Sequence, residues 1–140
     1  MKIETIGIIG AGQMGNGIAH VCARSGFEVK LLDENEETLK SSIEQIDKSL
    51  ERAIKRGEIN NDEKSKALLR VSTTSTYDHF KDCQLVIEAA TENEQIKVAI
   101  INDLCSILNE HALIASNTSS ISITRLGAKS NRPGKFVGMH

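Results

Sequence analysis

The spacing of apolar residues along the 140-residue chain predicts strands and helices in alternation. Continuous apolar runs predict strands at residues 3–9, 28–32, 85–87, 112–115 and 136–139, with a short edge-type strand at 71–74. Apolar residues three or four positions apart predict helices at 14–24, 39–54 and 93–108, the last with Ile96, Ile100, Leu104 and Ile107 facing inward. Residues 60–66 are expected to form a connection into a short helix that includes Leu68 and Leu69. This alternation predicts an α/β fold with a mostly parallel sheet and right-handed crossovers.

A glycine-rich loop joins the first predicted strand to the first predicted helix, with the sequence Gly10-Ala11-Gly12-Gln13-Met14-Gly15. In such a loop the first glycine adopts a conformation closed to other residues, the second lets the backbone approach a pyrophosphate, and the third lets the helix pack against the strand. The unpaired N–H groups at the helix start favour an anion without any lysine. We therefore predict that residues 10–15 bind a dinucleotide; an unliganded or flavodoxin-like turn is the alternative.

An acidic pair at the end of the second predicted strand bears on which dinucleotide binds. Asp33 follows this strand directly, where a carboxylate can accept hydrogen bonds from both hydroxyls of an adenosine ribose. Glu34 adds a second negative charge, no arginine accompanies the pair, and Lys30 lies upstream within the strand. Because a 2′-phosphate would meet two carboxylates here, the sequence predicts NAD rather than NADP as the cofactor.

Composition and charge narrow the other partners. With 17 basic and 19 acidic residues the formal net charge is -2, which gives no electrostatic reason to expect nucleic acid or an anionic membrane. Cys22, Cys83 and Cys105 are widely spaced, which favours buried thiols in a reducing compartment over a metal site. No apolar run is long enough to span a bilayer, and the first strand begins too early to leave room for a signal peptide, so we expect one cytoplasmic domain over 1–140.

Four ordered motifs resemble the 3-hydroxyacyl-CoA dehydrogenases, the bacterial 3-hydroxybutyryl-CoA dehydrogenases above all. They are residues 10–19 (GAGQMGNGIA), 88–93 (EAATEN), 115–120 (ASNTSS) and 137–140 (VGMH). The resemblance implies a Rossmann-type doubly wound sheet and NAD-dependent interconversion of 3-hydroxyacyl-CoA and 3-oxoacyl-CoA. It covers only the family's first domain. In that family a helical domain follows, with the catalytic glutamate and the dimer interface, so the resemblance implies little activity for these 140 residues alone.

The same resemblance implies roles for individual residues. His140 matches the catalytic base, and histidine titrates near neutrality as that role requires. Ser119 matches a serine near the nicotinamide and the substrate hydroxyl, and Asn117 lies at the same strand end; a turn and helix cap is the plainer interpretation of this segment. Glu92 and Lys97 match cofactor contacts on the ribose and nicotinamide side, against the alternatives of a helix-start acid and a solvated lysine.

Basic residues on the long second helix are the candidates for coenzyme A. Ser49, Arg52 and Arg56 are spaced to share one face, where arginines can meet phosphates. Ser49 and Arg56 match family positions that contact the substrate's CoA, although lysine is more usual at the second position. Without the resemblance, a solvated helix face would be the preferred interpretation.

Three alternatives deserve weight. Tyr77 and Lys81 have the YxxxK spacing of short-chain dehydrogenases, but the other features of that class are missing, so we expect Tyr77 to be structural and its replacement by Phe to leave NADH binding unchanged. A β-hydroxyacid dehydrogenase of the 6-phosphogluconate type shares a glycine loop ending in Met-Gly and fits Ser119 and His140 less well. A non-catalytic module that senses NADH is the third hypothesis.

Overall fold

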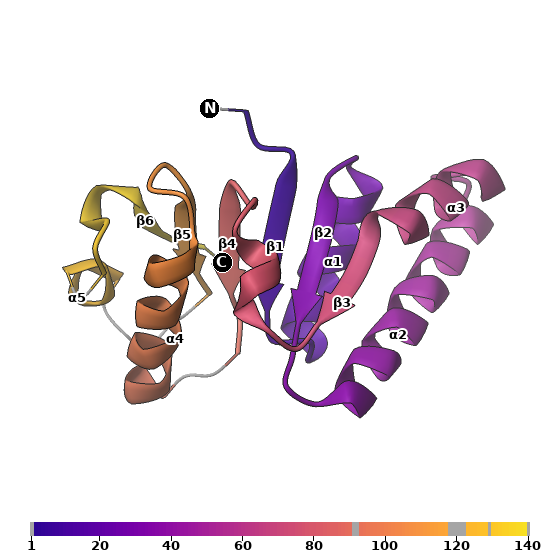
Figure 1. Ribbon diagram of the computed structural model, residues 1–140. Coiled ribbons are helices and arrows are strands. Elements are labelled where there is room, and N and C mark those ends of the chain that lie inside the picture. Colours follow the sequence, from indigo (N-terminus) through magenta and orange to yellow (C-terminus); the bar gives the residue numbers. More distant parts are fainter. Residues whose placement is uncertain (1, 91–92, 118–122, 129, 140) are drawn as a thin grey trace.

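A parallel six-stranded sheet forms the centre of the molecule in a computed structural model that describes residues 2–90, 93–117, 123–128 and 130–139 (Figure 1). The strand order is β3-β2-β1-β4-β5-β6, and each neighbouring pair is parallel. The strands are β1 Thr5–Ile9, β2 Glu28–Leu32, β3 Val71–Thr74, β4 Leu85–Glu88, β5 Leu113–Ser116 and β6 Phe136–Gly138. The order reverses between β1 and β4, and open α/β sheets bind ligands beyond the carboxyl ends of the strands at such a point.

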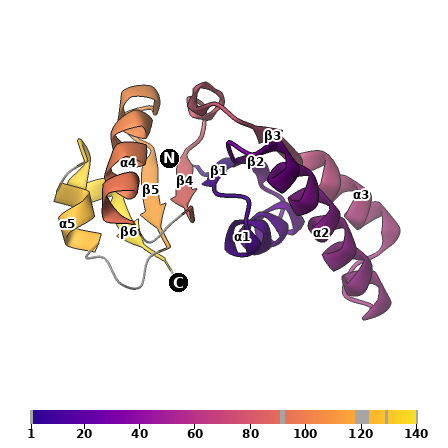
Figure 2. The ribbon, with the colours of Figure 1, turned by 90° about the horizontal axis from the view of Figure 1, so that it is seen from below.

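Helices cover both faces of this sheet. Figure 2 shows α1 and α2 on one side of the strands and α4 on the other. The first side carries α1 Gln13–Arg24, α2 Glu36–Lys55 and α3 Asn61–Arg70. The second side carries α4 Glu94–Ile107, α5 Ile123–Ala128 and the 3-10 turn η1 Tyr77–Phe80, while a second such turn, η2 Pro133–Lys135, leads into β6. The arrangement is the doubly wound Rossmann fold that the sequence predicts.

An aliphatic core lies on each side of the sheet, because successive side chains of a strand point to opposite faces. The first core includes Ile8, Leu31, Ile46 and Leu50, and the second includes Ile9, Val86, Ile101, Leu104 and Ile114. Burial of each such side chain stabilises the fold by about 2 kcal/mol. The buried positions of α1 are the small residues Gly15, Ala19 and Ala23, so this helix lies close to the strands. Its first turn is thereby held at the carboxyl end of β1.

Most predicted elements are confirmed, and two expectations about helices are wrong. The β3 strand is at an edge of the sheet, as predicted. Residues 60–66 are not a connection, because Asn60 and Glu63 form a capping box that begins α3 at Asn61. Ile96 does not face inward either: it is 50% exposed, whereas Lys97 is fully buried.

The cysteines only partly follow the prediction of buried thiols. Cys83 is buried, and burial raises the pKa of its thiol to about 12. Cys22 and Cys105 are half-buried, and all three are free thiols. Among the described residues no group of three or more His, Cys, Asp or Glu side chains is arranged to hold a metal ion. No helix in the same part of the chain combines the length and the apolar character needed to cross a membrane.

Candidate functional site

The glycine loop between β1 and α1 is tightly constrained at two of its glycines. Gly10 has a φ of 100°, and its N–H donates to the carbonyl of Leu32 at 2.8 Å. A Cβ added at Gly10 would lie 2.8 Å from the carbonyl oxygen of Ala89, and one added at Gly15 would lie 1.7 Å from the carbonyl oxygen of Gly10. The fold itself therefore requires glycine at both positions.

The middle glycine is different, because no atom of the described residues restricts a side chain there. Gly12 has an ordinary φ of -71°, and a Cβ added there would meet no atom within 4 Å. Gly12 is also the N-cap of α1, has no capping side chain, and no acidic residue follows in the first turn. By contrast, asparagines cap α2, α3 and α4. Free N–H donors beside open space fit a pyrophosphate that approaches the backbone.

Asp33 ties the glycine loop to the end of β2. Its Oδ2 accepts a hydrogen bond from the Ala11 N–H at 3.0 Å, and its Oδ1 accepts one from the Asn35 N–H at 3.0 Å. The carboxylate also borders an adjoining cavity, where its remaining lone pairs can accept further hydrogen bonds. Asp33 thus shapes the loop, a role that sequence reasoning missed, and is placed where its predicted contact with a ribose is possible.

This cavity, here called the strand-end cavity, lies beyond the carboxyl ends of β1, β2 and β4. It has a volume of about 580 Å³, and its lining includes Gly10, Asp33, Glu34, Tyr77, Ala89, Ile96 and Ile100. Carboxylates border it at the end of β2, and apolar side chains of η1 and α4 border it elsewhere. One cavity therefore offers hydrogen-bond acceptors and an apolar wall.

A buried ion pair holds the ends of β4 and β5 beside this cavity. Lys97 of α4 pairs with Glu88 of β4, and both side chains are fully buried. Glu88 also accepts hydrogen bonds from the Ser116 hydroxyl at 2.9 Å and from the Ala90 N–H at 2.7 Å. The interpretation of Lys97 as a solvated lysine is therefore wrong, because Glu88 draws it into the interior. Its predicted cofactor contact stays a prediction.

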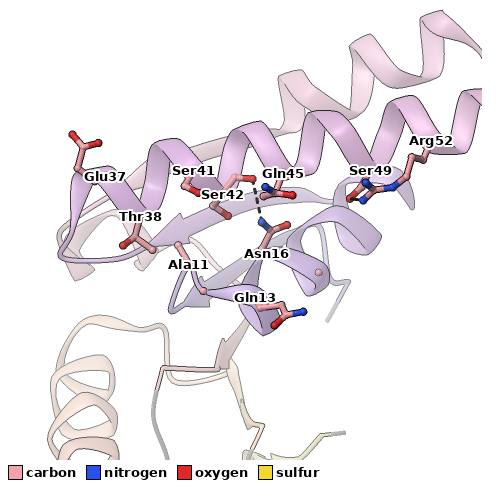
Figure 3. A pocket seen from close by; sticks show the side chains of 12 residues that line it. Ala11, Gln13, Asn16, Glu37, Thr38, Ser41, Ser42, Gln45, Ser49 and Arg52 are labelled. Carbon is pink, nitrogen blue, oxygen red and sulfur yellow. Dashed lines mark hydrogen bonds between the residues drawn. The ribbon is translucent and has the colours of Figure 1, made fainter.

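A second cavity, here called the helix groove, opens on the other side of the glycine loop. It lies between α1 and α2, has a volume of about 800 Å³, and is lined by polar side chains, among them Asn16, Ser41, Gln45, Ser49 and Arg52 (Figure 3). The Asn16 side chain donates to the carbonyl of Ser42 at 3.3 Å, which links the two helices. Arg52 donates to the Ser49 hydroxyl at 3.0 Å.

Positive charge gathers at one end of the helix groove. Burial, and then Arg24, Arg52 and Arg56, hold the pKa of His20 below its ordinary value. The His20 Nε2 atom is buried and has no hydrogen-bond partner in the described part of the chain. Glu58 partly balances the cluster, and the hydrogen bonds that it accepts from Arg24 and Arg56 lower its pKa. The surplus of cations makes this end suited to an anion.

Comparison with known proteins identifies the family. The family model of the 3-hydroxyacyl-CoA dehydrogenase NAD binding domain matches residues 5–140. The chain belongs to this family. It is 47% identical over 138 residues to a 3-hydroxybutyryl-CoA dehydrogenase of Bradyrhizobium diazoefficiens, with 99% of this chain and 47% of that protein covered. It matches the crystal structure of (S)-3-hydroxybutyryl-CoA dehydrogenase from Ralstonia eutropha with a TM-score of 0.95 at 44% identity, over 99% of this chain and 49% of that one.

The match concerns the NAD-binding part of the family. The chain spans about half the length of the 3-hydroxybutyryl-CoA dehydrogenases that it matches. It spans 19% of the fatty acid oxidation complex subunit alpha of Idiomarina loihiensis, to which it is 36% identical over 139 residues. NAD, predicted from the loop and Asp33, is the cofactor that the family model names. The alternative of a β-hydroxyacid dehydrogenase gives way to this assignment.

Several predicted site residues of the 3-hydroxyacyl-CoA dehydrogenase domain lie outside the described ranges. They are Glu92, Ser119 and His140, whose roles stay predictions. The strands that precede the last two are neighbours, since Ser116 of β5 pairs with Gly138 of β6. Asn117 follows β5 and donates its backbone N–H to the carbonyl of Glu88 at 2.9 Å. The sheet therefore brings the three strand ends together at one edge.

The structure places only one of the two predicted CoA contacts, Ser49 and Arg56, in the helix groove. Ser49 lines the helix groove as expected, together with Arg52. Arg56 does not line it: its Nε donates to Glu58 Oε2 at 2.6 Å, and its side chain is 61% exposed. Arg56 as a CoA contact stays a prediction. Sequence reasoning gave no role to Asn16 or Glu88, although Glu88 ends the apolar run of β4 and begins the 88–93 motif.

Proposed function

We propose that this domain is the cofactor-binding half of an enzyme that oxidises a 3-hydroxyacyl-CoA, such as 3-hydroxybutyryl-CoA, to the 3-oxoacyl-CoA, or catalyses the reverse reaction. Family membership over 5–140 supports the proposal. The observation that carries it is the open space at Gly12 beside the uncapped N-terminus of α1, with Asp33 holding the loop in place. This combination suits a pyrophosphate and an adjoining ribose.

The candidate site residues each have a defined part in this proposal. The N–H groups at the start of α1 bind the pyrophosphate, and Asp33 accepts hydrogen bonds from the adenosine ribose. Bound at the strand ends by these residues, NAD would supply the hydride acceptor for C3 of the substrate. His140 takes the proton of the C3 hydroxyl, and Ser119 donates a hydrogen bond to the same oxygen. A carboxylate that orients His140 would come from a second domain, as in the family that the sequence resembles.

The helix groove is the proposed site of the CoA part of the substrate. It adjoins the glycine loop, and the polar side chains of Gln13, Asn16 and Ser49 are among those that line it. Arg52 supplies the positive charge inside the groove, while Arg56 is engaged with Glu58. Because a guanidinium can form two parallel hydrogen bonds to one phosphate, we expect Arg52 to contribute more to CoA binding than Arg56.

Calorimetric titration of the chain with acetoacetyl-CoA, after separate titration with NADH, tests the proposal. We expect both ligands to bind, and Arg52→Gln to weaken acetoacetyl-CoA about tenfold, as for loss of a charge-assisted hydrogen bond. Lys40→Gln is the matched control, because Lys40 lies on α2 beside a different cavity. NADH binding by a chain that does not bind acetoacetyl-CoA would count against the CoA substrate.

Two broader statements belong to the same proposal. The three free thiols fit a reducing, cytoplasmic location. Dimerisation is expected of the longer family members through their helical domain, and 3-hydroxybutyryl-CoA dehydrogenases are about twice as long as this chain. Sedimentation of this chain and of a fusion to such a domain would test the second statement, with dimers expected only in the fusion.

A further inference from the structure

One aromatic side chain is placed at the strand-end cavity, and it is the residue that sequence reasoning took to be structural. The chain has three phenylalanines, one tyrosine and no tryptophan. Phe80 and Phe136 are buried in the second core, and Phe27 packs against the first. Tyr77 lines the strand-end cavity instead, at the start of η1. It is thus the aromatic ring that a bound ligand can reach there.

The Tyr77 side chain packs against the second core but is only partly buried. The turn that carries it, η1, contacts α4. Its hydroxyl makes no hydrogen bond within the part of the chain that the structure describes. Burial, and then Asp103, Glu34 and Glu88, raise the pKa of the phenol, so the ring stays neutral at physiological pH. A fixed, neutral aromatic ring is suited to contact with an aromatic base.

The rest of the strand-end cavity divides into a polar and an apolar part. Asp33 and Glu34 border it at the end of β2, where hydroxyls of a ribose would be bound. Ile96 and Ile100 of α4 border it together with Tyr77. Ile96 is 50% exposed, so part of its side chain remains open to contact with a ligand. An adenosine matches this arrangement, because its hydroxylated ribose would fit the polar part of the cavity and its flat base the apolar part.

We propose that Tyr77 is an adenine-contacting residue of the NAD site, forming the apolar wall of the strand-end cavity with Ile96 and Ile100. This inference rests on the cofactor binding included in the proposed function, and not on the CoA substrate. Lys81 is not among the residues that line the cavity, and the proposal concerns an adenine contact rather than a catalytic Tyr-Lys pair. The ring, rather than the hydroxyl, is the group that acts.

The composition of the chain allows a direct test. Because Tyr77 is the single tyrosine and there is no tryptophan, the intrinsic emission of the protein reports on Tyr77 alone. AMP is the probe, since it carries the base and ribose of the cofactor without the nicotinamide. We expect a saturable change in emission during an AMP titration, with the same dissociation constant that calorimetry gives. AMP that binds by calorimetry without changing the emission would overturn the inference.

Substitutions at Tyr77, with a control at Phe27, distinguish the contribution of the Tyr77 ring to binding from a general effect on the fold. Tyr77→Leu should weaken AMP and NADH about tenfold, as for loss of base stacking, whereas Tyr77→Phe should keep both affinities within about twofold. Phe27→Leu removes a ring from the opposite side of the sheet and should leave AMP affinity unchanged. Acetoacetyl-CoA binding that fails while the Tyr77 response to AMP persists contradicts the CoA proposal and supports this one. Equal AMP affinity of Tyr77→Leu and wild type would contradict the adenine contact.

Discussion

The two cavities beside the glycine loop are built in different ways. The strand-end cavity lies at the ends of β1, β2 and β4, whose relative positions the register of the parallel sheet determines. The helix groove is bordered by side chains on facing sides of α1 and α2, of which Arg52 is long and flexible. We infer that the strand-end cavity is preorganised by the fold, and that the helix groove is adaptable. Substitutions of the buried residues that hold the first cavity in place should therefore cost stability, whereas substitutions around the second should mainly change binding.

The largest contrast is expected within the glycine loop itself. Gly15→Ala places a Cβ 1.7 Å from the carbonyl oxygen of Gly10, so α1 or the loop must move. We expect a loss of about 4 kcal/mol in the free energy of unfolding, at the upper end for single substitutions. Gly12→Ala meets no atom within 4 Å and should change stability by less than about 1 kcal/mol. Urea unfolding monitored by circular dichroism measures both, and equal losses would refute the distinction.

The next effect concerns the buried ion pair at the strand ends. Lys97→Met leaves Glu88 buried without its cation, which should reduce the free energy of unfolding by about 3 kcal/mol. Lys97→Met combined with Glu88→Gln removes both charges and should lose less than Lys97→Met alone.

A matched control for this pair lies between α2 and α3. Lys64 of α3 pairs with Asp47 at 2.6 Å and with Glu51, and both acids are about half exposed. Lys64→Met should therefore cost less than about 1 kcal/mol. Similar losses for Lys97→Met and Lys64→Met in the same urea titrations would argue against a preorganised strand-end cavity.

The smallest predicted effect is a pH dependence at the charged end of the helix groove. The pKa of His20 is lowered in the folded state, so the unfolded state binds more protons as the pH falls below about 6.5. The stability that neutral His20 provides is therefore present above this pH and is lost as the pH falls through the lowered pKa. Unfolding measured between pH 7 and pH 5 should show a shallower decline for His20→Gln than for wild type.

The origin of this pKa can be checked independently. NMR titration should place the His20 pKa below its ordinary value in wild type. Arg52→Gln should raise it, because Arg52 is one of the cations that oppose protonation. No change on Arg52→Gln would show that Arg52 lies away from His20 in solution. That result would contradict the structure of this end of the helix groove.

Features that depend on backbone alone could be predicted from the sequence. Hydrophobic periodicity located the strands, and the glycine spacing with Asp33 located the cofactor edge of the sheet, because both follow from local geometry. The sequence could not predict that Arg52, and not Arg56, lies in the helix groove. Arg56 pairs with Glu58, and this ion pair forms only because the chain turns at the end of α2. Lys97 was misjudged for a similar reason: its partner, Glu88, belongs to another element. Which side chains pair with each other depends on how the elements pack, and the sequence pattern of one element does not contain that information.

Calorimetric titration of wild type and Gly12→Ala with NADH and NADPH tests most directly whether the fold presents a preformed NAD site. We predict that wild type binds NADH at one site per chain and NADPH at least about tenfold more weakly, because Asp33 and Glu34 repel a 2′-phosphate. Gly12→Ala, folded as wild type, should lose about tenfold or more in NADH affinity, since its methyl group occupies the space of the pyrophosphate. Unchanged NADH binding by Gly12→Ala, or equal affinity for NADPH, would contradict this assignment of the site.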